Sequence, residues 1–269
     1  MPAIQPERLK QQCKDLAAHF SRPSHFVREL THLLEFYADR AQRPDQANKR
    51  SSVIPTYHIA QQVFKRILSE LVLRAEADPE NGFELAEALW REPSLESRLI
   101  SIHLLGHIPA ADPGLIIGKI DQWHQENRDE TLQSTLASDG LRYLRKEAPN
   151  HLFSQIGKWI SHDDMERQKL GLVALRSLLT DPNYENLPAA YKMITPLVQE
   201  APSTLRPYLL ELIQILAKRS ANETALFLRD LAISNNTNTS KWLIRYSAGM
   251  FPPTLEHDLR SLLRGKTRK

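Results

Sequence analysis

Four arginines recur at comparable places along the chain, each close to the start of an apolar stretch. They are Arg98, Arg167, Arg206 and Arg245. Arg167 and Arg206 are 39 residues apart, and so are Arg206 and Arg245, whereas Gln133 lies 35 residues beyond Arg98. An arginine in the first turn of a helix stands beside free backbone N–H groups, so it can build a site for an anion such as a DNA phosphate. The alternative is an ion pair with an acidic residue of the neighbouring repeat, because the positive end of a helix does not by itself favour a cation.

Further basic side chains accompany these arginines. They are Lys158, Lys169, Lys192, Lys218, Arg219 and Lys241. If successive helices align them on a concave surface, they form a positive track for the backbone of double-stranded DNA. An ordinary solvated helix face would carry a similar set of residues.

Helical hairpins must position these side chains. In the stretch KWISHDDMERQKLGLVAL, residues 158–175, apolar residues recur at helical spacing on both sides of a short acidic turn. Ser161 and Asp163 are the expected N-cap residues of the second helix, and Asp164 and Glu166 suit its positive end. The same layout returns in four other stretches: residues 84–106, 120–144, 197–216 and 231–250.

Helix pairs that recur at about 35–47 residues are typical of a helical solenoid. The chain has only nine glycines and no run of alternating Val, Ile and Thr, so an all-α fold is expected. We predict one HEAT-like α-solenoid domain of about 12–13 helices over residues 1–269. Residues 1–56 would form an N-terminal helical cap, 57–262 the helical-hairpin repeats and 263–269 a basic tail.

Composition narrows the functional class. The chain is 41% apolar and 25% charged, with a net charge of +3, which permits a nucleic-acid partner without requiring one. A single cysteine, Cys13, excludes an internal disulfide and a cysteine-based zinc cluster. With no signal-peptide core and no apolar run of the roughly 20 residues that span a bilayer, the sequence predicts a cytoplasmic protein without membrane contact. His103 and His107 have the spacing of a metal pair but lack a third ligand, so we expect neither a metal nor a cofactor.

Four stretches of the sequence together resemble a known family. They are LAEALWREPSLESRLISIHLLG (85–106), LASDGLRYL (136–144), KWISHDDMERQKLGLVALRSLL (158–179) and KWLIRYSAGM (241–250). Their order and separation resemble those of the AlkD-like HEAT-repeat DNA alkylation repair proteins, over roughly residues 60–262. The resemblance implies a monofunctional DNA glycosylase that removes cationic or bulky N-alkylated bases, with a carboxylate that stabilises an oxocarbenium-like sugar.

The resemblance assigns roles to particular residues. It places the catalytic carboxylate on Asp139, and the two aromatic walls of the lesion pocket on Thr135 and Met250. Neither Thr nor Met offers the π face that a cationic base prefers. We expect one helix to run through LASDGLRYL, with Asp139 on the face shared by Thr135, Leu136 and Tyr143. Other aromatic side chains could replace the missing walls: Tyr143, Trp242 and Tyr246.

The family's paired arginines fall on Arg167, which is kept, and on Gln168, which replaces the second one. The alternative for Asp139 is a surface carboxylate that pairs with Arg142 at i+3. The four tryptophans are expected to pack between helices rather than to stack on bases.

Together these features favour a monomeric DNA-binding helical-repeat protein in which excision is weakened or absent because of the lost aromatics. The candidate DNA-binding residues are Lys158, Arg167, Lys169, Arg206, Lys241 and Arg245. The alternative is a HEAT-type protein–protein interaction scaffold without enzymatic activity, the commonest use of helical solenoids.

Overall fold

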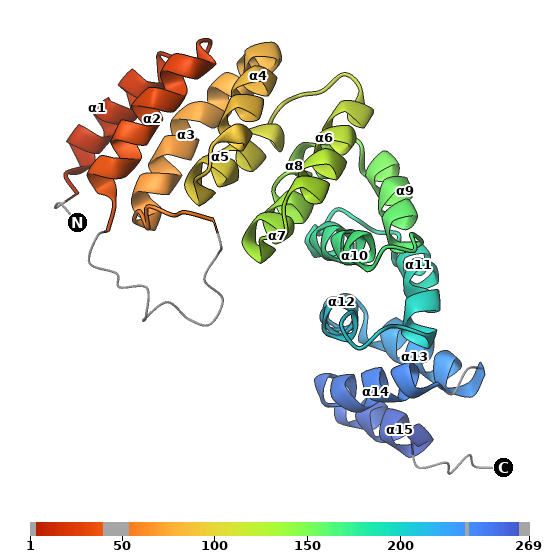
Figure 1. Cartoon of the computed structure of the whole chain (residues 1–269). Coiled ribbons are helices and arrows are strands. Elements are labelled where there is room, and N and C mark those ends of the chain that lie inside the picture. Colours follow the sequence, from red (N-terminus) through yellow and green to blue (C-terminus); the bar gives the residue numbers. More distant parts are fainter. Residues whose placement is uncertain (1–3, 40–53, 235–236, 264–269) are drawn as a thin grey trace. The chain divides into compact units, whose positions relative to one another are not determined.

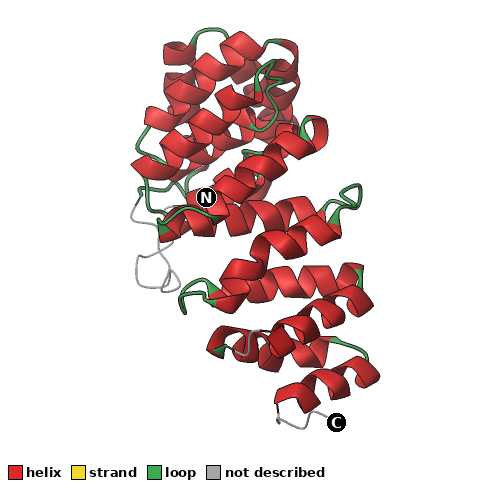
Figure 2. Cartoon of the chain, turned by 90° about the vertical axis from the view of Figure 1, so that its right-hand side faces the viewer, coloured by secondary structure: helices red, strands yellow, loops and turns green. Residues whose placement is uncertain are grey.

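The computed structural model describes residues 4–39, 54–234 and 237–263. Over these residues the chain forms helices joined by short loops and contains no strand (Figure 2), which confirms the all-α prediction. The chain divides into two compact units, Met1–Ala148 and Pro149–Lys269. The arrangement of both units in one solenoid domain stays a prediction.

The first unit contains eight labelled helices. They are α1 (Pro6–Ala17), α2 (Pro23–Tyr37), α3 (Gln61–Ala77), α4 (Pro79–Arg91), α5 (Leu95–Leu105), α6 (Pro113–Glu126), α7 (Glu130–Ser138) and α8 (Arg142–Glu147). Helices α1, α3, α5 and α7 pack side by side in one layer, and α2 packs on α4 in a second layer. Residues 1–56 therefore contribute α1 and α2 to the same stack as the later helices.

The second unit continues the pattern of paired helices. It contains α9 (Pro149–Ile160), α10 (Met165–Thr180), α11 (Leu187–Gln199), α12 (Arg206–Arg219), α13 (Ala221–Ser234), α14 (Asn238–Ser247), the short 3-10 helix η2 (Ala248–Met250) and α15 (Pro253–Leu263). Helices α10, α12 and α14 pack side by side in one layer, with α12 in the middle. Helices α9 and α11 belong to a second layer beside it (Figure 1). The series α1–α15 is somewhat longer than the 12 or 13 helices expected. Most of the predicted basic tail, residues 264–269, lies outside the described residues.

Local sequence signals explain where the helices begin. Proline occupies the first helical position of α4 and α6, where its missing N–H costs nothing. Before these helices, the carboxylates of Asp78 and Asp112 accept hydrogen bonds from free backbone N–H groups of the first turn. Helix α10 is capped by Asp164, which accepts from the N–H of Glu166 at 3.1 Å. The prediction of Ser161 or Asp163 as the cap was therefore wrong by one to three residues.

A repeated hydrogen bond closes the turn between the helices of three successive pairs. The fourth residue of the second helix donates its side-chain N–H to the backbone carbonyl six residues earlier. The three bonds join Arg98 to Glu92 at 3.0 Å, Gln133 to Asn127 at 2.8 Å and Gln168 to His162 at 2.8 Å. These donors are 35 residues apart in each case (133 − 98 and 168 − 133). Gln168 and not Arg167 is thus the structural equivalent of Arg98, which leaves Arg167 without this task.

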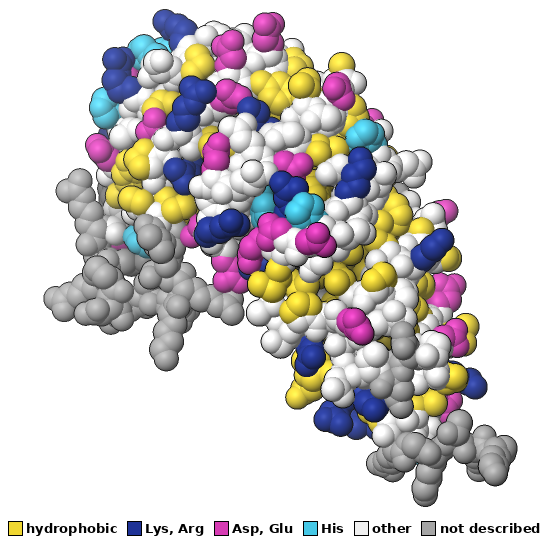
Figure 3. Space-filling model, turned by 45° about the vertical axis from the view of Figure 1, so that its right-hand side comes forward, with side chains coloured by type: hydrophobic (Ala, Val, Ile, Leu, Met, Phe, Trp, Pro, Cys, Tyr) yellow, Lys and Arg dark blue, Asp and Glu magenta, His cyan; other side chains and the backbone are white. Residues whose placement is uncertain are grey.

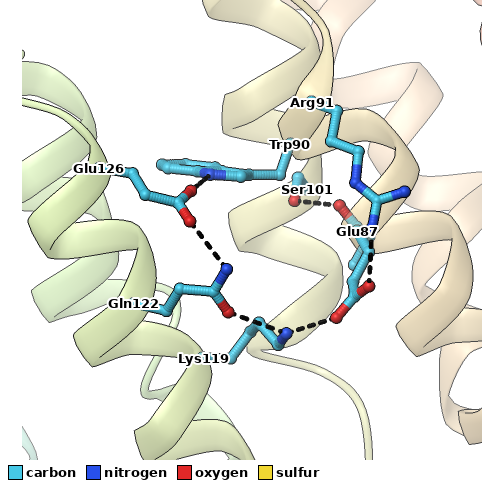
Figure 4. Close-up of polar contacts among 8 residues, drawn as sticks. Glu87, Trp90, Arg91, Ser101, Lys119, Gln122 and Glu126 are labelled. Carbon is cyan, nitrogen blue, oxygen red and sulfur yellow. Dashed lines mark hydrogen bonds and ion pairs between the residues drawn. The ribbon is translucent and has the colours of Figure 1, made fainter.

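Three of the four tryptophans pack between helices, as predicted for all four, whereas Trp242 is half-buried beside Tyr246 of the same helix. Trp90, Trp123 and Trp159 are buried, and the rings of Trp90 and Trp123 stack at 4.6 Å with an interplanar angle of 10°. The indole N–H of Trp90 donates to Glu126 at 2.6 Å, so the polar edge of a buried ring is satisfied. The chain of contacts continues through Gln122 and Lys119 to α4 (Figure 4), which fixes α6 against α4.

One break in the helices was not predicted. The stretch LASDGLRYL was expected to be a continuous helix with Asp139 and Tyr143 on one face. Helix α7 instead ends at Ser138, and α8 begins only at Arg142. No helix in the described part of the chain combines the length and apolar character needed to cross a membrane.

Candidate functional site

Asp139 stands at the C-terminal end of α7, where the chain leaves the helix. Its side chain is 40% exposed. One carboxylate oxygen, Oδ2, accepts a hydrogen bond from the hydroxyl of Ser138 at 3.0 Å, and the guanidinium of Arg145 binds the backbone carbonyl of Ser138. The carboxylate is thus accessible, while the bond from Arg145 holds the backbone at the end of α7.

Two glycines bring the ends of α5 and α7 into direct backbone contact. A Cβ on Gly106 would lie 1.8 Å from the carbonyl oxygen of Asp139 and 3.3 Å from the Cα of Gly140. A Cβ on Gly140 would meet Ile120 at 2.7 Å and the carbonyl oxygen of Leu136 at 2.8 Å. Gly106 has φ −71° and ψ −7°, angles open to any residue, so the close approach alone requires glycine there. This contact sets the position of Asp139 relative to α5.

The side chain nearest to the carboxylate comes from α5. Nδ1 of His103 lies 3.8 Å from Oδ1 of Asp139, and the His103 side chain is 21% exposed. Burial lowers the pKa of His103 below 6.5, the negative charge of Asp139 opposes this effect, and His107 and Arg142 lower the pKa further. The ion pair with Arg142, considered as the alternative role of Asp139, is absent from the ion pairs of the described residues, and His103 occupies that place.

Of the two lesion-wall candidates near Asp139, Thr135 has no ring, whereas Tyr143 contributes its side chain to a pocket. Thr135 lies on α7 one turn before Asp139, and its hydroxyl donates to the carbonyl of Thr131 at 2.8 Å. Tyr143 is half-buried on α8, and its backbone N–H donates to the carbonyl of Gly106 at 2.9 Å. With Arg142, Lys146 and His107, Tyr143 lines a pocket of about 250 Å³.

The second unit carries cations and aromatic rings on one layer. We use the name cation–aromatic series for Lys169 on α10, Arg206 and Tyr208 on α12, and Trp242 and Tyr246 on α14. The ammonium of Lys169 lies 5.4 Å from the ring centre of Tyr208, and the guanidinium of Arg206 lies 6.0 Å from that of Trp242. The rings of Trp242 and Tyr246 follow at 4.6 Å. Tyr246 is 56% exposed, so the series ends on an open aromatic surface.

The other candidates of this unit lie on α9, α10, α14 and η2. Arg167 is half-buried in the first turn of α10, with Nη1 3.1 Å from Nε2 of His162. Lys241 is half-buried on α14, and Lys158 is exposed in the last turn of α9. Met250 is 39% exposed in η2, beyond the end of α14.

Arg245 departs from its predicted place. It is exposed in the last turn of α14, whereas the sequence pattern put it in a first turn. It belongs with Tyr246 on the surface rather than at a helix N-terminus. At the last turn of a helix a cation is favoured by the helix dipole, so no unusual role is needed to explain its position.

The structure decides against ion pairing as the reason for the recurrent arginines. The ion pairs within the described ranges include none of Arg98, Arg167, Arg206 and Arg245. Arg98 instead stacks on Trp90 at 5.4 Å, as Arg206 does on Trp242. Aromatic rings of neighbouring helices hold these two guanidinium groups, which leaves their N–H donors partly available.

Sequence reasoning missed three parts of the site. Gly106 and Gly140 were not singled out, although small residues after an apolar helix are a signal of close backbone approach. His103 was considered only with His107 as a metal pair. Across the residues that the structure describes, no group of three or more His, Cys, Asp or Glu side chains is arranged to hold a metal ion.

The candidate residues fall into two groups, one in each unit. Asp139, Thr135 and Tyr143 belong to the first unit, and the cation–aromatic series with its neighbours belongs to the second. A common site made from both groups stays a prediction.

Comparison with known proteins bears on what these groups serve. No match to a curated protein or to a solved structure was found. The family model described as DNA alkylation repair enzyme matches residues 30–256, which is most of the chain and includes every candidate named above. The chain therefore belongs to the DNA alkylation repair enzyme family.

Proposed function

We propose that the protein binds double-stranded DNA through the basic side chains of α10, α12 and α14, and that Asp139 promotes slow release of alkylated bases. The cation–aromatic series is the observation that carries the binding step. Phosphates are attracted by Lys169, Arg206 and Arg245, and the ring of Tyr246 offers a π face to an exposed base or sugar. Membership of the repair family supports DNA as the partner.

The carboxylate of Asp139 supports the chemical step. A cationic alkylated base is already a good leaving group, so a negative charge beside the sugar suffices to stabilise the developing sugar cation. The carboxylate of Asp139 is accessible, and the backbone of Asp139 packs directly against Gly106. Thr135 and Met250, in the places where the family resemblance implies aromatic walls, provide no π face to hold the lesion. Excision is therefore expected to be slow.

Salt dependence of DNA binding tests the first step. The triple substitution Arg167→Ala, Lys169→Ala and Arg245→Ala removes three cations from the proposed footprint. Because each phosphate contact contributes about 0.9 to the slope of log K against log salt, the slope should fall by nearly 3. The positive track expected from the sequence included Lys192, but Lys192 is exposed on α11, outside the layer of α10, α12 and α14, so Lys192→Ala serves as the matched control and should leave the slope unchanged. An unchanged slope in the triple variant removes these residues from the footprint.

The chemical step is tested separately. Wild-type protein should release methylated bases from duplex DNA, and Asp139→Asn should release none while it binds the same DNA with equal or slightly higher affinity. Equal, measurable release by both proteins would refute the role of Asp139.

A scaffold for a protein partner is the second candidate function. Leu226 and Ile233, seven residues apart on one face of α13, are 56% and 62% exposed. The face shown in Figure 3 mixes basic, acidic and hydrophobic side chains, which suits a protein surface as partner. This function is favoured if duplex DNA of any kind fails to bind at low salt.

A cytoplasmic location is part of the proposal. Its support is the single cysteine: Cys13 is 1% exposed in the core of the first unit and can form no internal disulfide.

A further inference from the structure

His103 is a half-buried titratable side chain that faces the proposed catalytic carboxylate. It stands in the third turn of α5, in the same layer as α3 and α7. Its Nδ1 points to Oδ1 of Asp139 at 3.8 Å, a separation longer than a hydrogen bond but within the range of a charge pair. The other carboxylate oxygen of Asp139, Oδ2, accepts the hydrogen bond from the hydroxyl of Ser138.

The groups around His103 fix the ring. The ring of Phe64, from α3, meets the imidazole edge to face with centroids 5.8 Å apart. The backbone carbonyl of His103 lies 2.8 Å from Nδ1 of His107, and the contact of Gly106 with Asp139 holds α5 and α7 together one turn further on. The imidazole of His103 is half-buried against Phe64, so it has little freedom to turn away from Asp139.

The charged and titratable groups that act on His103 come from three places. Asp139 at the end of α7 favours the protonated ring, whereas His107 beyond α5 and Arg142 at the start of α8 disfavour it. Helix α3 packs the ring of Phe64 against the imidazole. Burial outweighs the attraction of Asp139, so the imidazole is neutral at neutral pH and has a free nitrogen lone pair.

We propose that His103 is the positioning and proton-accepting partner of Asp139 during base excision. This inference rests on the proposed function. It concerns a residue 36 positions away in the sequence (139 − 103), on a different helix.

The proposed step hydrolyses the bond between the sugar and the alkylated base. The bond between the sugar carbon C1′ and the base nitrogen breaks, its electron pair stays on the nitrogen, and the alkylated base leaves as a neutral molecule. Asp139 stabilises the positive charge left on the sugar. In the same step the oxygen of a water molecule bonds to C1′ and gives one proton to the Asp139 carboxylate, which passes a proton to Nδ1 of His103 once the two groups close from 3.8 Å to hydrogen-bond distance in the DNA complex. The positive charge of the substrate thus ends on the imidazolium, Asp139 remains an anion, and the imidazolium loses its proton to solvent.

The test measures the single-turnover rate of base release from duplex DNA with N7-methylguanine, between pH 5 and pH 8. In the wild type the rate should fall as the pH drops below the pKa of His103, because the protonated ring accepts no proton. The variant His103→Asn keeps a polar atom near the position of Nδ1 but takes up no proton. Its rate should be roughly 100-fold lower, the lower limit of general-base effects, and independent of pH over this range.

His151→Gln is the control for substitution of a histidine, because His151 is exposed on α9 and takes no part in the site. It should behave as the wild type. Circular dichroism melting of His103→Asn separates loss of the proton acceptor from loss of the fold. If that variant does not fold, the pH dependence of the wild-type rate of base release still tests the role of His103.

A second measurement does not depend on excision. The imidazole C–H signal of His103, followed by NMR, should titrate at lower pH in Asp139→Asn than in the wild type, because the charge of Asp139 raises the pKa of the ring. An unchanged titration overturns the pairing.

Two further outcomes overturn the inference and differ from each other. A wild-type rate with the same pH profile as that of His103→Asn rejects the role of His103 and leaves the proposed function intact. No base release by the wild type at any pH rejects the excision step, and the proton transfer with it, while the DNA-binding measurement stands by itself.

Discussion

Replacing Gly106 by alanine should both destabilise the first unit and displace Asp139. The new Cβ would lie 1.8 Å from the Asp139 carbonyl oxygen and 2.9 Å from its carbonyl carbon, and these are backbone atoms that cannot swing aside. Overpacking of a dense site costs about 1–3 kcal/mol, and because the clashing atoms belong to the backbone, Gly106→Ala should cost about 3 kcal/mol. For a unit of this size, the midpoint of thermal unfolding should fall by roughly 6–12 °C.

Gly118→Ala is the matched control. Gly118 lies inside α6, and its added Cβ would meet no atom within 4 Å. Alanine in a helix interior is more stable than glycine by about 0.5–1 kcal/mol, so this variant should unfold at the wild-type temperature or slightly above it. Thermal unfolding followed by circular dichroism compares the three proteins.

The same pair of variants separates chemistry from binding. A displacement of about 1 Å at a catalytic group can reduce a rate 100-fold, so Gly106→Ala should lose base release at a temperature where it remains folded. Its affinity for DNA should persist, because the cation–aromatic series lies in the other unit. A Gly106→Ala protein that melts with the wild type and keeps its activity would refute the backbone contact between α5 and α7.

Two other predictions concern the core of the first unit. Glu126→Ala leaves the indole N–H of the buried Trp90 without its acceptor, so chemical denaturation followed by tryptophan fluorescence should show a loss of about 1–3 kcal/mol; a loss below 0.5 kcal/mol would contradict the bond. Burial raises the pKa of Cys13 to about 12, so at pH 8 the thiol is protonated and shielded. Reaction with a thiol reagent should then be slow in the folded protein and fast in denaturant, and rapid labelling of the folded protein would speak against this burial.

The helical pairs could be predicted because apolar spacing reports which face of a helix is buried. The spacing in residues 158–175 placed α9 and α10 correctly, although Asp164 rather than Ser161 or Asp163 supplies the cap. Several polar residues in one turn can each cap a helix, and only the path of the chain selects one. The repeat predicted from the recurrent arginines was less accurate, because Arg167 is one residue out of register with Arg98 and Gln133. The repeated feature is a side-chain N–H donor at the fourth helical position, and Gln168 supplies it as well as arginine does.

The site around Asp139 could be predicted only in part. The family resemblance pointed to Asp139, but a continuous helix from Thr135 to Tyr143 was expected, since nothing in LASDGLRYL except Gly140 signals a break. The contact of Gly106 with Asp139 forces that break, and it joins residues that lie on different helices. The pairing of His103 with Asp139 has the same origin, so local spacing suggested His107 as its partner instead.

The division of the chain at residue 148 has an evolutionary consequence. The carboxylate with its histidine and the exposed cations with their aromatic rings are encoded in separate, independently packed halves. A substitution in one half can therefore be absorbed there without repacking the other. Under the proposed function, a lineage can lose excision through changes near Asp139 and keep DNA binding, whereas regaining both aromatic walls needs changes in each half, at Thr135 and at Met250.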